Sequence, residues 1–370
     1  MKVMTIVGTR PEIIRLARVI ARLDALPTVE HVLVHTGQNY DRQLNDVFFE
    51  ELEIRSPDHF LDVDTSSLGA VLGDVLRKTE AVLLEERPDA VLVLGDTNSC
   101  VATVMAKRMR IPTYHMEAGN RSFDENVPEE INRRLIDHVA DFNIAYTEHA
   151  RRNLLAEGLH PRRILVCGSP MREVLDHYRE GIERADVLER LGLEAHRYFL
   201  VSAHREENVD SPARLRALLA CLQRVSTDHD LPVVVSTHPR TRKRLEALGE
   251  TVDGDVRWLE PFGFFDYNHL QMNARCVLSD SGTISEEAAI LGFPAVTLRD
   301  AIERPEALDA GSIMMTGLDP DDVVRAIAVV TQELPGSTPE GYDVTDTSAR
   351  VVRHLLSTAS RHHAWAGIRT

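Results

Sequence analysis

The chain has 370 residues, of which 43% are hydrophobic and 27% charged, and its formal net charge is −16. Because this length exceeds the size at which one hydrophobic core usually keeps growing, two domains are expected. The acidic balance argues against a nucleic-acid-binding protein, which needs a basic face for phosphates, and no apolar run is long enough to span a membrane. No secretory signal is recognisable, so a cytoplasmic protein is expected.

The cysteine pattern indicates neither a zinc site nor a disulfide framework. The four cysteines lie far apart in the sequence and form no CxxC pair: Cys100, Cys167, Cys221 and Cys276. Buried free thiols are therefore expected.

The first half of the chain alternates apolar strand segments with helical patterns, which predicts a parallel sheet. The strand segments are 3–8, 31–38, 90–99, 110–119, 143–147 and 164–170. In open sheets of this kind ligands bind beyond the carboxyl ends of the strands, where Arg10, Asp96 and Glu117 emerge. Taken alone, Asp96 has a structural alternative as the cap of a helix that starts near Ser99.

The turn after the first strand is a candidate anion site. Gly8, Thr9, Arg10 and Pro11 lead into a helix, whose free backbone N–H groups and dipole favour an anion, and Arg10 adds a cation. The turn is not a dinucleotide fingerprint, because its second and third glycines are missing.

Segment 115–138 is predicted to be a loop that feeds a helix. Asn126 is a suitable cap and Pro128 suits the first turn. Ile131, Leu135 and Val139 recur every four residues and predict an apolar stripe that faces a core.

The other face of this helix is expected to be charged. Glu129 with Arg133 and Glu130 with Arg134 stand four residues apart, with the acid first, which is the favourable order for helical ion pairs. A solvated, salt-bridged face is the structural alternative to a functional role for these residues.

The second half repeats the alternation of strands and helices, and the domain hinge is expected near 168–170. The predicted domains are 1–169 and 170–345, and a last helix within 346–370 is expected to pack back on the first domain. Three predicted strands of the second half end in His204, His238 and Ser281. A histidine in such a place is more often a hydrogen-bonded structural residue than a catalyst, but three polar residues at equivalent strand ends favour a site.

The clearest anion site in the sequence is predicted at a helix start. Ser281, Gly282 and Thr283 can turn backbone N–H groups toward a phosphate. Glu286 and Glu287 follow, where compensation of the helix dipole is the structural reading and acceptance of hydrogen bonds from ribose is the functional one for one of them. Arg304, before Pro305, offers a guanidinium to a phosphate or a carboxylate.

At this point the ordered motifs resemble a known family. The motifs are GTRPE, HTGQ, GDTNS, HMEAGNRS, PEEINRRLIDH, SAHREENVD, DSGTISEEA and ERPEA. Together they span nearly the whole chain and resemble the non-hydrolysing UDP-N-acetylglucosamine 2-epimerases. The segments QNYD, AGNR, FGFFDYNHLQMNA and DSGTIS look closest to the branch that makes UDP-N-acetyl-L-fucosamine from a UDP-6-deoxy-L-talosamine derivative.

The resemblance implies an α/β fold of two Rossmann-like domains facing a cleft, of the glycosyltransferase-B type, with UDP held mainly by the C-terminal domain. It implies an isomerase that eliminates UDP, leaves a 2-acetamidoglycal and adds UDP back after C2 has been protonated from the other face. No cofactor or metal is implied, the ligand is a UDP-linked N-acetylamino sugar, and the family suggests a homodimer.

The resemblance also assigns residues by matching motif positions. The positions matched to acid–base work or the diphosphate's neighbourhood are Asp96, Glu117, Glu129 and His204. The positions matched to UDP or substrate binding are Arg10, Arg15, Arg133, His238, Ser281, Gly282, Thr283, Glu287 and Arg304.

Three departures from the family pattern have consequences. Arg15 stands where many members carry lysine, which keeps the charge but changes the donor geometry, and Thr283 replaces a glycine beside the phosphate. Residues 39–41 depart from the segment that forms an activating second site in bacterial members, so no activation by substrate is predicted. The alternatives are a UDP-N-acetylglucosamine 2-epimerase giving UDP-N-acetylmannosamine, a glycosyltransferase of the same fold, a hydrolysing 2-epimerase and a sugar-nucleotide sensor.

Overall fold

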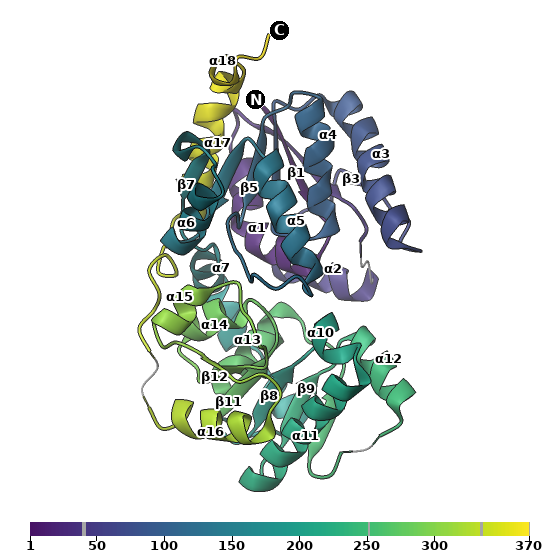
Figure 1. Cartoon of the computed structure of the whole chain (residues 1–370), viewed down its shortest axis with the longest axis vertical. Helices are drawn as coiled ribbons and strands as arrows, with labels where there is room; N and C mark the ends of the chain where they lie inside the picture. Colours follow the sequence, from purple (N-terminus) through teal and green to yellow (C-terminus); the bar gives the residue numbers. More distant parts are fainter. Residues whose placement is uncertain (39–41, 251, 334–335, 370) are drawn as a thin grey trace. The chain divides into compact units, whose positions relative to one another are not determined.

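The computed structural model describes residues 1–38, 42–250, 252–333 and 336–369, with the backbone alone for 42–46. The chain forms two compact units (Figure 1). Unit 1 contains Met1–Asp176 and Asp343–Thr370, and unit 2 contains His177–Tyr342. Residues 39–41, on which the prediction about substrate activation depends, lie outside the described residues.

Unit 1 is built on a seven-stranded parallel sheet with the strand order β3-β2-β1-β4-β5-β6-β7. The strands are β1 Lys2–Val7, β2 Glu30–His35, β3 His59–Phe60, β4 Ala90–Leu94, β5 Thr113–Met116, β6 Phe142–Ala145 and β7 Ile164–Val166. Six of them were predicted, because buried parallel strands are continuous apolar runs. The short edge strand β3 has no such run and was missed.

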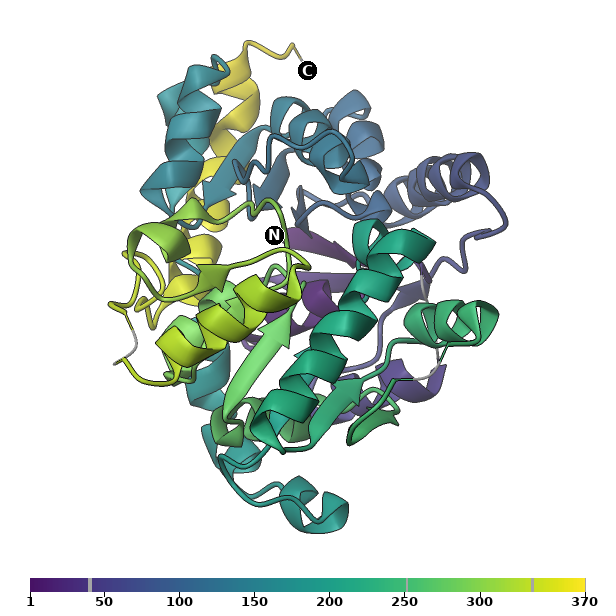
Figure 2. The ribbon, with the colours of Figure 1, turned by 60° about the horizontal axis from the view of Figure 1, so that its bottom comes forward.

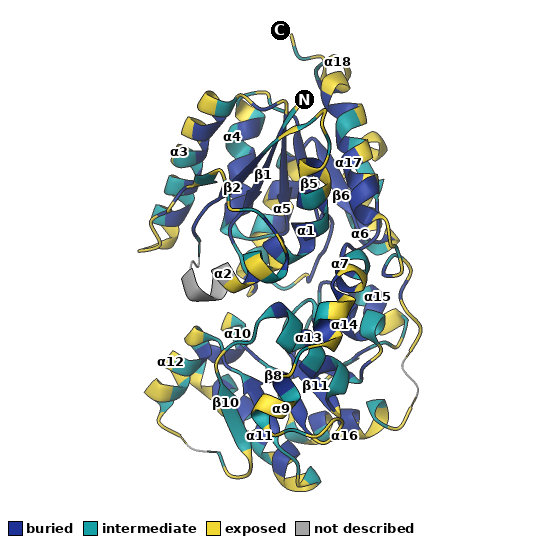
Figure 3. Ribbon diagram, turned by 180° about the vertical axis from the view of Figure 1, so that it is seen from behind, coloured by how far each residue is buried: buried dark blue, intermediate teal, exposed yellow. Residues whose placement is uncertain are grey.

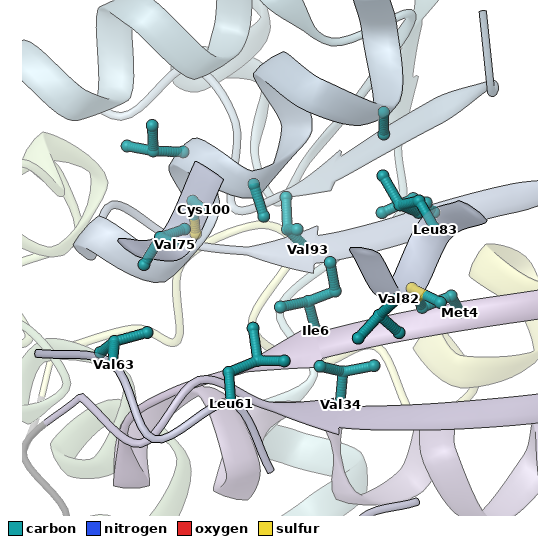
Figure 4. Packing of buried hydrophobic residues seen from close by; sticks show 14 of the residues in the cluster. Met4, Ile6, Val34, Leu61, Val63, Val75, Val82, Leu83, Val93 and Cys100 are labelled. Atoms are coloured by element: carbon teal, nitrogen blue, oxygen red, sulfur yellow. The ribbon is translucent and has the colours of Figure 1, made fainter. Parts of the chain in front are cut away.

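The helices of unit 1 cover both faces of this sheet. They are α1 Arg10–Asp24, α2 Arg42–Glu51, α3 Leu68–Glu86, η1 Asn98–Val101, α4 Ala102–Arg108, α5 Pro128–Val139, α6 Glu148–Ala156, η2 Pro161–Arg163, α7 Met171–His177, α17 Thr347–Thr358, η3 Ala359–Arg361 and α18 His362–Ala366. On one face, Met4, Ile6 and Val34 pack against Val75 and Leu83 of α3 (Figure 4). This packing buries a continuous apolar layer that holds the strand ends in place.

The C-terminal helix α17 belongs to unit 1 and packs against α1. Arg22 Nε donates to Ser348 Oγ at 2.9 Å, and the hydroxyls of Tyr114 and Thr358 lie 2.7 Å apart. These bonds tie α17 to an early helix and to a central strand.

Helix α5 turns a different face to the protein interior from the one predicted. Ile131 and Leu135, expected to face a core, are 66% and 42% exposed. The buried side chains of α5 are Glu130, Arg133, Ile136 and Asp137. The predicted apolar stripe is therefore wrong, because α5 buries Ile136 in the core together with polar side chains that find partners beyond the strand ends, and Ile131 and Leu135 lie outside this face.

The start of α5 was predicted more closely than its orientation. Pro128 opens the helix as expected, but Val127 is the N-cap residue, and Asn126 donates its backbone N–H to Asp124 Oδ1 at 2.9 Å. The predicted ion pair between Glu130 and Arg134 is confirmed at 3.2 Å.

Unit 2 has a six-stranded parallel sheet with the order β10-β9-β8-β11-β12-β13. The strands are β8 Phe199–Ser202, β9 Val233–Ser236, β10 Val256–Leu259, β11 Cys276–Ser279, β12 Ala295–Thr297 and β13 Met314–Met315. The helices are α8 Arg179–Glu183, α9 Val187–Leu191, α10 Glu206–Val209, α11 Pro212–His229, α12 Pro239–Leu248, α13 Phe264–Asn273, α14 Ile284–Leu291, α15 Pro305–Asp309 and α16 Pro320–Val330.

Alternate side chains along the strands of the second sheet point to its two faces, and each face is covered by helices. Phe199 and Val201 of β8 face α11 and α16, which lie side by side (Figure 2). Tyr198 and Leu200 point to the opposite layer, which contains Leu270 of α13. This period of two buries the strands on both sides (Figure 3).

The strand order reverses direction at one place in each sheet, between β1 and β4 in unit 1 and between β8 and β11 in unit 2. Ligands of open parallel sheets bind beyond the carboxyl ends of the strands at this reversal. The predicted α/β fold with two such sheets is confirmed, and so is the burial of all four free cysteines. No helix in the described part of the chain is both long and apolar enough for a membrane span.

Candidate functional site

The turn after β1 is closely packed around Gly8. A Cβ atom added to Gly8 would lie 1.9 Å from Ser99 Oγ and 2.3 Å from Thr36 Oγ1. These two hydroxyls are themselves hydrogen-bonded at 2.8 Å, so they are fixed between the turns that follow β2 and β4. Gly8 is thus required by the close approach of three neighbouring strand ends.

Replacing Gly8 by alanine is expected to destabilise unit 1 by about 2 kcal/mol, because overpacking a filled site forces its neighbours to move. Gly73→Ala in α3 is the matched control, since an added Cβ there meets nothing within 4 Å. Thermal unfolding of both variants checks the expectation, and equal melting temperatures would contradict it.

Glu117 is held in a strained conformation at the end of β5. Its φ is +65°, in the left-handed region that non-glycine residues rarely adopt, and the residue is 8% exposed. Arg15 of α1 forms an ion pair with Glu117 Oε2, and Asn120 Nδ2 lies 3.5 Å from Oε1. A strained backbone conformation persists only where the surrounding structure holds it, and such residues cluster at active sites. The conformation of Glu117 therefore supports a functional role for this residue.

Asp96 leaves the same edge of the sheet as Glu117. Leu94 pairs with Met116 in the register of β4 and β5, so the residues that follow the two strands emerge next to each other. Arg133 of α5 holds Asp96 Oδ2 through Nη2 at 2.7 Å and Nε at 2.8 Å. The end of the sheet therefore carries two carboxylates, each paired with an arginine.

The buried carboxylate of Glu130 supports this arrangement from within α5. Its Oε2 accepts from Arg133 Nη1 at 3.2 Å and from the backbone N–H and the hydroxyl of Ser122 at 3.0 and 3.1 Å. Burial acts to raise the pKa of Glu130, but the bonds from Ser122 and the charge of Arg133 outweigh it and hold that pKa below its usual value. Glu129 lies in the first turn of α5, where the helix dipole favours its ionised form.

Glu12 is a buried carboxylate of this site that the sequence reasoning missed. Its Oε2 accepts the backbone N–H groups of Gly8 and Thr9, and its Oε1 accepts the hydroxyl of Thr97. Burial raises the pKa of Glu12 to about 7. The signal in the sequence was a glutamate three residues after Thr9, which is the capping-box spacing.

Arg10, the arginine of the predicted anion site after β1, is the first residue of α1. Its guanidinium carbon lies 5.6 Å from the centre of the Phe48 ring. Arg10, Arg15 and Arg133 thus all belong to unit 1, and the first two are on the same helix as Glu12.

In unit 2, the polar residues predicted at the strand ends gather around Asp280. Ser202 pairs with Ser279 in the register of β8 and β11, so His204 and Ser281 leave the sheet side by side. The side chain of Asp280 is fully buried and accepts the backbone N–H groups of His204 and Arg205 at 3.0 to 3.1 Å.

Asn208 and His238 complete this cluster. Asn208 Nδ2 donates to Asp280 Oδ2 at 3.1 Å. The ring of His238 has its centre 5.6 Å from that of His204, and its Nδ1 accepts the backbone N–H of Arg240, which caps α12. The His238 ring therefore has the hydrogen-bonded setting of the structural reading, His204 is held through its backbone N–H, and the two rings lie together at the strand ends.

The turn of Ser281, Gly282 and Thr283 precedes α14 as predicted. The Ser281 hydroxyl accepts the backbone N–H of Thr283 at 3.3 Å and lies 2.9 Å from its hydroxyl. A Cβ on Gly282 would meet Glu303 Oε1 at 2.6 Å and Arg304 Nη1 at 2.9 Å. Glycine is needed at this position because buried charged side chains pass close to the backbone.

Arg304 and Glu287 contribute to this cluster in different ways. Arg304 is buried, pairs with Glu286 at 3.3 Å and donates to the backbone oxygen of Gly282, so it braces the turn. Glu287 Oε2 accepts from Gln271 Nε2 at 2.7 Å. The sequence did not point to Gln271 or Asp280.

The structure brings the sequence-predicted residues together in two clusters, one in each unit. The cluster of unit 1 contains the pairs Arg15–Glu117 and Arg133–Asp96, and the same unit holds Arg10 and Glu129 in the first turns of α1 and α5. The cluster of unit 2 contains His204, His238, Ser281, Gly282, Thr283, Glu287 and Arg304. Among the residues that the structure describes, no three histidine, cysteine or carboxylate side chains are placed to hold a metal ion.

Comparison with known proteins shows which family the whole chain resembles. The model of the UDP-N-acetylglucosamine 2-epimerase family matches residues 21–356. A solved UDP-N-acetylglucosamine 2-epimerase from Rickettsia bellii is 46% identical, with a TM-score of 0.91 and 98% of each chain covered. A Methanocaldococcus jannaschii UDP-GlcNAc 2-epimerase, solved with UDP-GlcNAc and UDP, is 35% identical with a TM-score of 0.91, over 96% of this chain and 100% of that one.

A relative that is named for another sugar is nearly as similar to this chain as the Methanocaldococcus jannaschii enzyme. The UDP-2,3-diacetamido-2,3-dideoxy-D-glucuronate 2-epimerase of Pseudomonas aeruginosa is 34% identical over 359 residues, which are 96% of this chain and 99% of that protein. The similarity thus extends over the full length of proteins that share one type of reaction and differ in the sugar.

Proposed function

Because the chain belongs to the UDP-N-acetylglucosamine 2-epimerase family, we propose that it inverts C2 of a UDP-linked N-acetylamino sugar. The protein is an isomerase of UDP-sugars. The reaction proposed here removes the proton of C2 while the bond between C1 and the UDP oxygen breaks, which leaves a 2-acetamidoglycal and free UDP. A proton then adds to C2 from the other face as UDP returns to C1, so that no redox change is required.

The observation that carries this proposal is the pair of carboxylates at the ends of two neighbouring strands, Glu117 with Arg15 and Asp96 with Arg133. Inversion at C2 needs a proton acceptor on one face of the sugar and a proton donor on the other. We assign this work to Asp96, Glu117 and Glu129.

The nucleotide is assigned to unit 2. The backbone N–H groups of the turn at 281–283 are donors for the diphosphate, and such donors also stabilise the charge that develops on departing UDP. His204 and His238 add polar groups beside that turn. Glu287 is proposed to accept the ribose hydroxyls, with Gln271 holding it in place.

Arginines complete the proposed binding of the substrate. Arg10 is proposed to contact the diphosphate, while Arg15 and Arg133 hold the catalytic carboxylates. Arg304 acts through the turn that it braces, because its guanidinium is buried against Glu286 and Gly282.

The sugar is the finer part of the proposal. The resemblance of the segments QNYD, AGNR, FGFFDYNHLQMNA and DSGTIS to one branch of the family supports a 6-deoxy-L-sugar, with UDP-N-acetyl-L-fucosamine as the product. The names of the relatives from Rickettsia bellii and Methanocaldococcus jannaschii favour UDP-N-acetylglucosamine as a second candidate.

Proton NMR in deuterated water tests the reaction and the sugar together. The purified protein is offered UDP-N-acetyl-L-fucosamine and UDP-N-acetylglucosamine separately, with no acceptor present. Deuterium is expected to enter C2 of one of them as its C2 epimer appears. A protein that binds UDP but exchanges no C2 proton in either sugar would contradict the proposal. A second assay with added acceptors would then test for a glycosyltransferase, which releases UDP only when its acceptor is present.

A further inference from the structure

Glu12 connects two turns of unit 1 that carry different parts of the proposed site. One carboxylate oxygen accepts the backbone N–H groups of Gly8 and Thr9, directly before Arg10. The other accepts the hydroxyl of Thr97, directly after Asp96. The side chain is 2% exposed, so it has little opportunity to replace these bonds with water.

We propose that Glu12 is a positioning residue, whose ionised carboxylate locks the turn of Arg10 to the turn of Asp96 so that turnover requires the ionised form. The inference rests on the proposed function, because Arg10 and Asp96 are the groups whose placement is at stake. Glu12 itself touches no substrate in this proposal, and it acts through Gly8, Thr9 and Thr97.

The hydrogen-bond pattern of Glu12 is complete in the ionised form. All three strong contacts of Glu12 are donors, and a carboxylate accepts from all of them. A proton on Oε2 would face two backbone N–H groups, which cannot accept it. A proton on Oε1 would be donated to the Thr97 hydroxyl oxygen, which also accepts the backbone N–H of Ser99, and the Thr97 hydroxyl hydrogen would then need another acceptor. Protonation thus reverses the bond between Glu12 and the residue that follows Asp96.

Two titratable groups face Glu12 from the elements packed against it. The charge of Asp96 opposes ionisation of Glu12, and the thiol of Cys100 in η1 lies 3.9 Å from Oε1. Arg133 neutralises Asp96 from α5 and limits this repulsion. Burial has the largest effect and raises the pKa of Glu12 to about 7, so the change of protonation falls near neutral pH.

The raised pKa of Glu12 also determines in which direction the stability of unit 1 changes with pH. A carboxyl group whose pKa is higher in the folded state contributes stability below its ordinary pKa, and this contribution is lost as the pH rises through about 7. An ionised Glu12 therefore weakens the fold of unit 1 while it orders the site. A residue that only caps α1 would show the stability effect without a pH effect on turnover.

The variant Glu12→Gln separates these roles, because glutamine has the shape of the protonated carboxyl at every pH. Wild-type kcat is expected to fall on the acid side of about pH 7. In Glu12→Gln, kcat is expected to be at least about 10-fold lower at pH 8 and to lack this acid limb, with KM within about twofold of wild type. The melting temperature of the variant is expected to exceed that of wild type at pH 8.5 and to match it at pH 5.

Glu85→Gln, an exposed glutamate of α3, is the control and is expected to change none of these quantities. A Glu12→Gln enzyme with wild-type kcat, or one that keeps the acid limb, would overturn the inference. Failure of the proposed function is a different result, because it appears first as an absence of C2 exchange in the wild-type protein. In that case the inference about turnover falls with it, whatever the variant does.

Discussion

Glu117→Gln is expected to lower kcat by at least about 100-fold and to leave the affinity for UDP within about twofold of wild type. Glutamine keeps the shape of the side chain but can neither accept a C2 proton nor return one. It also loses the ion pair with Arg15, while the UDP-binding turn that we assign to unit 2 keeps its own contacts. Deuterium exchange at C2 measures the chemistry, and calorimetric titration with UDP measures binding.

The neighbouring variant Asp96→Asn is expected to behave in the same way, because Asp96 has the same setting with Arg133. Glu148→Gln, in the exposed first turn of α6, is the matched control for a lost surface carboxylate. An equal loss of UDP binding and turnover in Glu117→Gln would assign Glu117 to the scaffold rather than to the chemistry.

Asp280→Asn is expected to lower the stability of unit 2 by about 3 kcal/mol and the affinity for UDP by at least about 10-fold. The Asp280 carboxylate accepts from the backbone of His204 and Arg205 and from Asn208. An amide in its place leaves one oxygen for these donors and directs an N–H group at the others. The turn that carries His204 is then free to move away from the turn at 281–283.

The control for this variant is Asp253→Asn, because Asp253 is an exposed aspartate of the same unit. Thermal unfolding and UDP titration of both variants test the expectation. A stable Asp280→Asn protein with unchanged affinity for UDP would show that the buried carboxylate does not organise the phosphate-binding turn.

Most of the fold was predictable because parallel strands buried on both faces are apolar along their whole length. The runs that end at Gly8 and at Asp96 mark β1 and β4, and the glycine and polar residues behind them mark the strand ends. The two-residue strands β3 and β13 were not predictable, since their pairing depends on a neighbouring strand and not on a pattern of their own.

Helix α5 shows where a periodic pattern misleads. The spacing of Ile131 and Leu135 is helical, and the residues do lie in a helix, but their side chains are exposed. The buried face carries Glu130, Arg133 and Asp137, which find charged partners at the sheet edge. Periodicity identifies the helix, whereas the direction that it faces depends on partners that are far away in the sequence.

The candidate site was predictable where a residue stands directly after a strand and was missed where a residue supports such a position from elsewhere. Asp96 and Glu117 were found for the first reason. Glu12 reads as an ordinary helix cap, and its bond to Thr97 spans 85 residues of sequence. Asp280 reads as the end of a strand, and its bonds to the backbone of His204 and Arg205 and to the Asn208 side chain, 72 to 76 residues earlier, appear only in the folded chain.

The discontinuous composition of unit 1 has a consequence for synthesis on the ribosome. Unit 2 is one uninterrupted stretch, His177–Tyr342, whereas unit 1 needs both ends of the chain. Tyr114 in the middle of the first sheet cannot meet Thr358 until residue 358 has left the exit tunnel. The later-made unit can therefore complete its folding first, and the surface of α1 that α17 covers stays open to chaperones until α17 has emerged.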